Sequence, residues 1–128
     1  MTDPLISAAT NARENAVAAF SGFKVGSAVE DENGHIFTGC NIENATYGLT
    51  MCAERVAIFK ALSEGIRNFT RLVVVADTQT LTPPCGACRQ LIWEFCGDVE
   101  IVLSNLDGKM ETMRLATLFP RAFDASFL

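Results

Sequence analysis

The positions of apolar residues along the chain predict where its helices and strands lie. After Asp3-Pro4, a pair typical of a helix N-cap and first helical residue, apolar residues recur at helical spacing. This spacing predicts a first helix that runs to about Phe20. Two extended apolar runs follow at 25–29 and 35–40, and the Asn33-Gly34 pair between them predicts a β-hairpin.

The middle of the chain alternates between helix and strand signals. Thr50 can cap a second helix and Gly65 can end it. This helix is apolar almost all round, so we expect it to be buried against a sheet. The continuous β-branched run 72–76 predicts a central strand. Pro83-Pro84 then precedes a third helix of about ten residues, which ends near Gly97.

The last third of the chain predicts one more strand and one more helix. Residues 100–104 form the strand, Asp107-Gly108 turns the chain, and a short helix ends before Pro120. The predicted order is helix, strand, strand, helix, strand, helix, strand and a tail. This order is typical of an α/β fold in which a mixed sheet carries helices on its faces, and no linker divides residues 1–128 into more than one domain.

Composition and charge narrow the class of function. The 128 residues are 49% hydrophobic and 20% charged, as in folded globular domains. A net charge of −5 disfavours nucleic acid or an anionic membrane as the main partner, because both attract basic surfaces. No apolar run is long enough to span a membrane, and the first twenty residues lack the apolar core of a signal peptide. We therefore expect a cytoplasmic protein.

The five cysteines point to metal or thiol chemistry, since an odd number fits a disulfide framework poorly. Cys52 lies two residues before Glu54, and Cys85 and Cys88 follow Pro84 as Pro-Cys-x-x-Cys. A ligand two residues before a glutamate, followed by Pro-Cys-x-x-Cys, is the signature of zinc deaminases. The spacing therefore predicts one Zn²⁺ held by three thiolates.

Physical chemistry supports this interpretation of the motif. All three cysteines lie at predicted helix N-termini, where the helix dipole stabilises the thiolate that binds metal. Three protein ligands leave the fourth tetrahedral position open for water, as in catalytic zinc sites. Glu54 lies in the same turn as Cys52 and is the predicted proton carrier of the reaction.

Two arginines, two further cysteines and the single histidine lie outside the ligand motif. Three thiolates leave the zinc site with a formal negative charge, and a neighbouring cation would offset it. Arg55 and Arg89 follow ligands closely and are candidates, with Arg55 favoured; otherwise each is an ordinary helix-surface arginine. Cys40 and Cys96 have no ligand spacing, so we expect them in the core. The single histidine, residue 35, is expected to be exposed.

The segments 23–28, 39–55, 84–90 and 119–123 together resemble the small, homotetrameric cytidine deaminases over nearly the whole chain. The resemblance implies a three-layer fold with a mixed five-stranded sheet and helices on both faces. It also implies zinc-dependent hydrolytic deamination of cytidine and 2′-deoxycytidine to the uridine nucleosides, with release of ammonia, in pyrimidine salvage. The implied assembly is a homotetramer with shared active sites.

The resemblance also implies roles for substrate-binding residues. Asn41 and Glu43 would hold the ribose hydroxyls, and an amide and a carboxylate two residues apart at a strand end share one face. Phe23 would pack against the nucleoside, and the Ala53 backbone would orient the base edge. Residues from neighbouring subunits would complete the site: Ala45, Tyr47 and, from the C-terminal tail, Phe123.

One segment departs from the family pattern. The family usually carries Tyr-x-Pro-Tyr-Ser before the Phe23 segment, whereas Val17–Ser21 lacks the proline and both tyrosines. This change predicts a looser, more apolar rim. The alternative function is therefore a deaminase of modified cytosine nucleosides, or of another aminopyrimidine such as blasticidin S. Two further alternatives are a structural zinc protein, which would not explain Glu54, and a Cys-x-x-Cys thiol redox protein, whose activity would be lost to thiol alkylation but insensitive to zinc depletion.

Overall fold

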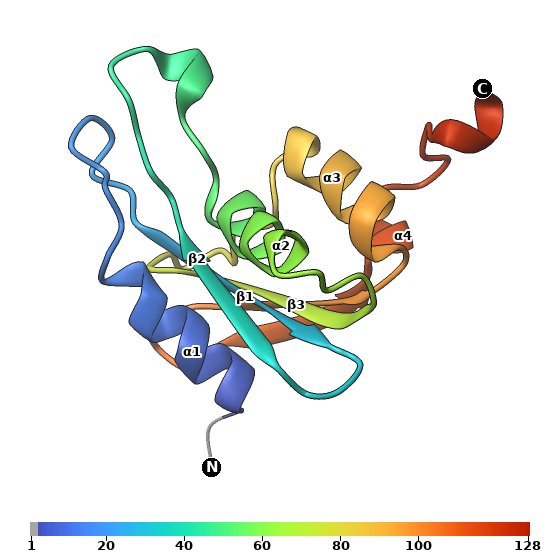
Figure 1. Ribbon diagram of the computed structural model, residues 1–128. Coiled ribbons are helices and arrows are strands. Elements are labelled where there is room, and N and C mark those ends of the chain that lie inside the picture. Colours follow the sequence, from blue (N-terminus) through green and yellow to red (C-terminus); the bar gives the residue numbers. More distant parts are fainter. Residues whose placement is uncertain (1–2) are drawn as a thin grey trace.

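Five strands form one mixed sheet in the computed structural model, which describes residues 3–128 (Figure 1). The spatial order is β2-β1-β3-β4-β5, with β3 and β4 parallel and every other neighbouring pair antiparallel. The strands are β1 (Val25–Asp31), β2 (Ile36–Cys40), β3 (Phe69–Ala76), β4 (Glu100–Ser104) and β5 (Met110–Arg114). The predicted mixed five-stranded sheet is confirmed.

Helices cover both faces of this sheet and give the predicted three layers (Figure 1). Along β3, Leu72 and Val74 pack into the cluster under α2 and α3, whereas Val73 and Val75 pack against α1. This alternation buries both faces of the central strand. The helices are α1 (Pro4–Arg13), α2 (Ala53–Ser63), α3 (Gly86–Cys96) and α4 (Leu115–Leu118), with short 3₁₀ turns η1 (Tyr47–Leu49) and η2 (Ala125–Phe127).

The prediction for the first helix was wrong at its end. The helix begins as predicted, with the Asp3 carboxylate accepting a hydrogen bond from the Leu5 N–H, but it stops at Arg13. Val17 leaves the helical path and pairs with Ile42 instead. The apolar residues after Arg13 keep helical spacing, but Val17 and the residues after it form a loop that contacts the segment following β2. This tertiary contact outweighs the local spacing.

The second helix also begins later than predicted. Thr50 is not its cap, because Met51 still pairs with Ile42 and the helix starts at Ala53 with Cys52 at the N-cap position. Nor is the helix buried all round. Its small residues and Ile58 face the sheet, whereas Phe59 remains 39% exposed.

Most other predicted elements were confirmed, and one strand was missed. The hairpin, the central strand, the strand 100–104 and the third helix lie where the pattern placed them. The strand at 110–114 went unrecognised because it is a mostly exposed edge strand with little apolar alternation. Among residues 3–128, no helix is long and apolar enough to cross a membrane.

Candidate metal centre and active site

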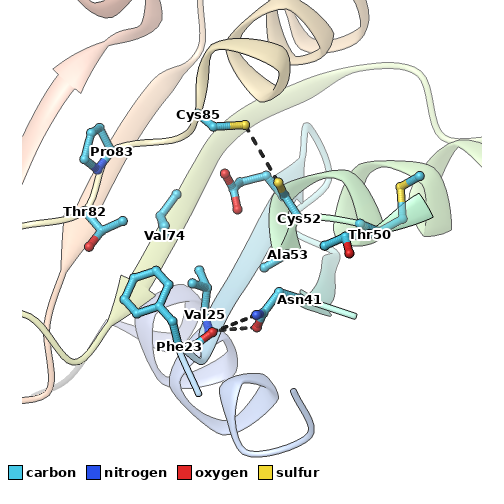
Figure 2. A pocket seen from close by; sticks show the side chains of 12 residues that line it. Phe23, Val25, Asn41, Thr50, Cys52, Ala53, Val74, Thr82, Pro83 and Cys85 are labelled. Atoms are coloured by element: carbon cyan, nitrogen blue, oxygen red, sulfur yellow. Dashed lines mark hydrogen bonds between the residues drawn. The ribbon is translucent and has the colours of Figure 1, made fainter. Parts of the chain in front are cut away.

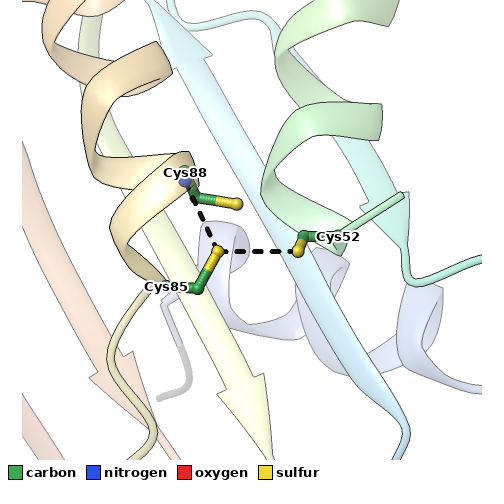
Figure 3. A group of neighbouring side chains, drawn as sticks. All are labelled: Cys52, Cys85 and Cys88. Carbon is green, nitrogen blue, oxygen red and sulfur yellow. Dashed lines mark hydrogen bonds between the residues drawn. The ribbon is translucent and has the colours of Figure 1, made fainter. Parts of the chain in front are cut away.

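Three cysteines from two separate parts of the chain meet between α2 and α3 (Figure 3). Cys52 is the N-cap of α2, Cys85 is the N-cap of α3, and Cys88 lies in the first turn of α3. Their sulfur atoms all lie within 4.8 Å of one another, and those of Cys52 and Cys85 are 3.7 Å apart. Tetrahedral zinc with Zn–S bonds of about 2.3 Å separates its sulfur ligands by about 3.8 Å, so these residues fit zinc.

The helix ends and a neighbouring arginine favour thiolate at this cluster. Arg55 donates from Nη2 to the Cys52 sulfur over 3.2 Å, which places its positive charge against the ligands. Hydrogen bonding to Cys88, together with the Arg55 guanidinium, lowers the pKa of the Cys52 thiol to about 5. The same pairing raises the pKa of Cys88, because the two sulfurs share one proton. The predicted contact of Arg55 with the ligand set is present.

Arg89 acts elsewhere. It donates from Nε to the Pro84 carbonyl over 2.8 Å and from Nη1 to the Leu118 carbonyl over 2.7 Å. These bonds tie the beginning of α3 to the end of α4. The structure therefore gives Arg89 a role in holding the Cys85 loop.

Glu54 is a buried acid beside the cysteine cluster. Its residue surface is only 4% exposed, in the first turn of α2, and its side chain lines the same cavity as Cys52 and Cys85. Burial raises the pKa of Glu54 to about 7, because the charged form loses its hydration, and the negative charge at Cys52 adds to this effect. A carboxyl that titrates near neutral pH can both accept and return a proton.

A cavity of about 190 Å³ opens beside these groups (Figure 2). Its walls combine an aromatic ring, an amide and the metal-binding thiols. Among the predicted substrate residues, it contains Phe23, Asn41 and Ala53. Its remaining lining residues are Val25, Thr50, Met51, Val74, Thr82 and Pro83.

Sequence reasoning assigned no site role to Thr82 or Pro83. The available signal was their position directly before Pro84-Cys85, since residues adjoining a ligand loop are carried into the same cavity. For Thr50 the sequence predicts only a role as helix cap. Its side chain instead accepts a hydrogen bond from the Asn44 N–H.

Asn41 and Glu43 lie at the end of β2 but line different cavities. Asn41 is buried and faces the first cavity, where its amide bonds the Val25 N–H and the Phe23 carbonyl. Glu43 lines a second cavity of about 330 Å³. Thr50 belongs to the walls of both cavities. The first cavity is smaller than the roughly 300–1,000 Å³ of most ligand sites, so a nucleoside needs space beyond it.

The residues expected to act in a neighbouring subunit lie outside the first cavity of their own chain. Ala45 is exposed, and Tyr47 is 75% exposed at the edge of the second cavity. Phe123 is 59% exposed on the C-terminal tail and stacks on Phe127. Their places in one chain are compatible with contacts to another copy.

The single histidine is exposed as predicted, and of the two cysteines predicted in the core only Cys96 packs against a core cluster. His35 is exposed and pairs with Asp31. Cys96 packs against the core cluster, where burial raises its pKa to about 12. Cys40 is only half-buried on β2.

Comparison with known proteins gives this geometry a family. Residues 2–104 match the family model described as the cytidine and deoxycytidylate deaminase zinc-binding region, which covers most of the chain. The chain belongs to this family. It is accordingly a zinc-binding enzyme of the deaminase class, with Cys52, Cys85 and Cys88 as the set that fits the metal.

Individual relatives agree with this assignment. The chain is 51% identical to the cytidine deaminase of Sporosarcina psychrophila over 94% of this chain and 90% of that protein. A crystal structure of the cytidine deaminase from Burkholderia pseudomallei superposes with a TM-score of 0.92 at 46% identity, over 96% of this chain and 100% of that one. The blasticidin-S deaminase of Bacillus cereus is more distant, at 32% identity over 75% of this chain and 74% of that protein.

Proposed function

We propose that the protein hydrolyses cytidine and 2′-deoxycytidine to uridine and 2′-deoxyuridine and releases ammonia. The observation that carries this proposal is the buried Glu54 carboxyl beside three clustered cysteines, in a cavity that Phe23 also lines. A structural zinc site has no use for an acid in this place.

Cys52, Cys85 and Cys88 would hold one zinc ion per subunit. When bound, zinc supplies a Lewis acid that lowers the pKa of water towards neutrality. The positively charged guanidinium of Arg55 donates a hydrogen bond to the Cys52 sulfur, which partly offsets the negative charge of three thiolates. The helix N-termini under Cys52 and Cys85 act in the same direction.

Glu54 carries the protons of the reaction. It accepts a proton from the attacking water and delivers it to ring N3 as the water oxygen bonds to C4. It then transfers the remaining hydroxyl proton to the amino group, so that the C4–N bond breaks and ammonia leaves. The balance is one water consumed and one ammonia released for each cytidine. A pKa near 7 suits both directions of transfer at neutral pH.

The nucleoside would occupy both cavities, with its base in the first and its ribose extending towards the second. The base lies in the first cavity against the Phe23 ring, with its edge towards the Ala53 backbone at the N-terminus of α2. Asn41 and Glu43 supply the polar groups for the ribose hydroxyls, and Glu43 reaches them from the second cavity. This division favours a nucleoside over a free base, because a free base has no hydroxyls for Glu43.

The active enzyme is proposed to be a homotetramer in which neighbouring subunits complete each site. Large apolar side chains lie exposed at the end of the molecule that carries the cavities, including Phe20, Tyr47 and Leu49. Ala45, Tyr47 and the tail residue Phe123 are the residues assigned to a neighbour's site. Sedimentation should give four times the chain mass. Mixed tetramers of Glu54→Gln and Phe123→Ala subunits should regain activity that neither parent shows.

A cytoplasmic role in pyrimidine salvage is part of the same proposal. All five cysteines are free, which suits a reducing compartment. Deleting the gene should abolish growth on cytidine as the sole pyrimidine source and leave growth on uridine intact. Cell fractionation should recover the activity with cytoplasmic markers.

The decisive experiment follows the ultraviolet spectrum of cytidine during incubation with the purified protein, with and without a zinc chelator. Conversion to uridine with stoichiometric ammonia is expected, together with loss after chelation and recovery on adding zinc. A zinc-loaded protein that leaves both nucleosides unchanged would contradict the proposal.

The altered Val17–Ser21 segment bears on substrate range. It lacks the two phenol groups and the proline of the family pattern, and Phe20 and Ser21 line the second cavity, so the wider rim is predicted on the ribose side of the substrate. Rates on cytidine and on a cytidine that carries one extra methyl group on the ribose should lie within about tenfold of each other, whereas a site that excludes such a group discriminates by about 10- to 200-fold. A strict preference for cytidine would count against a wider rim.

A further inference from the structure

The loop 18–23 lies along the segment that follows β2, and the two are joined by several contacts (Figure 1). The Val17 N–H donates to the Asn41 carbonyl over 3.0 Å, and the Glu43 N–H donates to the Val17 carbonyl over 2.8 Å. Above this bridge the Phe20 ring meets the Tyr47 ring edge-on, with centroids 6.0 Å apart. The loop is therefore fixed at its start by backbone bonds.

The Glu43 side chain holds the next part of the loop. One carboxylate oxygen accepts the N–H groups of Phe20 and Ser21, both over 3.0 Å, and the other accepts the Ser21 hydroxyl. These bonds, the Ser21 hydroxyl first among them, lower the pKa of Glu43. A carboxylate has about four acceptor positions, so three loop donors leave space for one more donor.

Ser21 passes this contact on to Phe23. While its hydroxyl donates to Glu43, its oxygen accepts the Phe23 N–H over 3.0 Å. The other side of the Phe23 backbone is held by Asn41, whose Nδ2 donates to the Phe23 carbonyl over 2.7 Å. The Phe23 ring itself lines the first cavity (Figure 2).

The loop has no substitute for this serine. Its other members are Ala18, Ala19, Phe20 and Gly22, whose side chains carry neither a donor nor an acceptor. A hydroxyl can donate and accept at the same time, which is what the link between Glu43 and Phe23 requires. Gly22 adopts a φ of +68°, so the turn between Ser21 and Phe23 also depends on glycine.

We propose that Ser21 is a positioning residue that couples Glu43 in the second cavity to the Phe23 ring in the first. The role of this coupling in catalysis rests on the proposed function, in which Glu43 binds a sugar hydroxyl and the Phe23 ring packs against the base. Ser21 then keeps these two contacts at a constant distance from each other. Ser21 does not touch the reacting atoms. It fixes the spacing between the sugar contact and the base contact.

The kinetic test compares Ser21→Ala with Ser21→Thr, which keeps the hydroxyl. Ser21→Ala should raise KM for cytidine about 10- to 100-fold, the range for losing a hydrogen bond to a charged group, and change kcat by less than about threefold. Ser21→Thr should restore KM to within about threefold of wild type. The control is Ser63→Ala, which removes an exposed hydroxyl bonded to the Lys60 carbonyl at the far end of α2.

A double-mutant cycle and amide exchange test the coupling itself. If Ser21 acts through Phe23, the KM effects of Ser21→Ala and Phe23→Leu should be non-additive. Hydrogen exchange at the Phe23 amide should also accelerate in Ser21→Ala and in Glu43→Gln, which requires no turnover. Additive KM effects, an unchanged KM in Ser21→Ala, or unchanged exchange in Glu43→Gln would each overturn the coupling. A wild-type protein inactive on cytidine would instead overturn the proposed function, and exchange would still decide the coupling.

Discussion

Glu54 and Arg55 are adjacent in the sequence, yet the first turn of α2 directs them to different tasks. Glu54 is buried and lines the cavity, and burial raises the pKa of its carboxyl to about 7. The carboxyl can therefore gain or lose a proton near neutral pH. Arg55 donates a hydrogen bond to the Cys52 sulfur and is not among the residues that line the cavity. At the scale of single residues, the proton chemistry and the ligand charge are thus separated by one position on the helix.

Replacing Glu54 with glutamine should remove the proton carrier and retain the metal. We expect kcat for cytidine to fall about 10²- to 10⁴-fold, the usual contribution of a general acid–base group. The zinc content per chain should stay at the wild-type level, because the carboxyl is not one of the three clustered ligands. Ultraviolet kinetics and metal analysis measure the two quantities.

The matched control for this variant is Glu64→Gln, at the exposed C-terminal end of the same helix. It should keep wild-type kcat. Wild-type turnover in Glu54→Gln would refute the role of Glu54 as proton carrier.

Replacing Arg55 with glutamine should weaken zinc binding. The variant loses the positive charge 3.2 Å from the Cys52 sulfur, and partners of metal ligands typically contribute 10- to 100-fold to affinity. Competition with a chromophoric chelator measures the change. Lys60→Gln, an exposed cation on the same helix, should leave zinc affinity unchanged; equal affinities in Arg55→Gln and wild type would contradict the role of Arg55.

At the scale of elements, two glycines in the hairpin decide how closely the helices approach the sheet. A Cβ on Gly26 would lie 2.0 Å from the Ala9 carbonyl oxygen of α1, and a Cβ on Gly39 would lie 2.4 Å from the Ala53 carbonyl oxygen of α2. These are backbone contacts, so the helices rest directly on neighbouring strands. Because Ala53 is flanked by Cys52 and Glu54, the Gly39 contact also sets the height of the active site above β2.

Gly39→Ala should therefore be destabilising and should disturb the site. The new methyl group must displace the backbone of α2, and overpacking of this kind costs about 1–3 kcal/mol or more. Chemical denaturation measures the loss. Gly48→Ala is the control, since its Cβ meets nothing within 4 Å and should change the free energy of unfolding by less than about 0.5 kcal/mol. Equal stability of both variants would show that the close approach is not required.

The first helix carries a pH-dependent contact. Asp3 caps α1 and pairs with Arg71 on β3 over 2.7 Å, and the hydrogen bond from Arg71 lowers the pKa of Asp3. A lowered pKa means that the pair stabilises the fold above the unfolded carboxyl pKa of about 3.9. That contribution is lost as the pH falls through the lower folded value.

Asp3→Asn keeps a good capping side chain and removes the charge. Its free energy of unfolding should be about 1 kcal/mol below wild type at pH 6, and the difference should shrink as the pH approaches 3. Asp3→Ala loses the cap as well and should remain less stable than Asp3→Asn throughout. A difference between Asp3→Asn and wild type that does not change with pH would contradict this assignment.

At the scale of the whole molecule, the C-terminal tail stands away from the sheet on the side of α3 and α4 (Figure 1). Two side chains of α3 hold it: Trp93 donates from Nε1 to the Asp124 carboxylate over 2.8 Å, and Gln90 donates to the Phe123 carbonyl over 2.9 Å. The Phe123 ring remains exposed and stacks on Phe127. The two hydrogen bonds from α3 thus anchor the tail, and the stacked rings of Phe123 and Phe127 remain accessible on its surface.

Loosening this base should be visible in fluorescence and in kinetics. Trp93 is the single tryptophan of the chain, so Asp124→Asn should change its emission. If Phe123 completes a neighbour's site as proposed, the same variant should raise KM for cytidine about 5- to 10-fold with the tetramer intact, since the lost bond involves a charged but partly exposed group.

Asp107→Asn, in an exposed turn, should alter neither emission nor KM. An Asp124→Asn variant with changed emission and unchanged KM would separate the tail from the active site and refute the role of Phe123.

The sequence by itself predicted the features that depend on near neighbours. The hairpin follows from Asn33-Gly34 between two apolar runs, and the central strand from an uninterrupted β-branched stretch. The ligand set Cys52, Cys85 and Cys88 with Glu54 was also readable, because a zinc site needs particular residue types at fixed short spacings around helix N-termini. These patterns are local, so they are visible without coordinates.

Only the tertiary structure decided the features that depend on distant partners. α1 ends at Arg13 because Val17 pairs with Ile42. β5 has a near partner in β4, but its own residues signal little, so only the pairing itself identifies it as a strand. Likewise, Glu43 was expected beside Asn41, but its carboxylate lies in a second cavity and binds Ser21. The contacts of Val17 with Ile42 and of Ser21 with Glu43 join residues more than 20 positions apart, and their free energy outweighs the weak local preferences of an exposed loop.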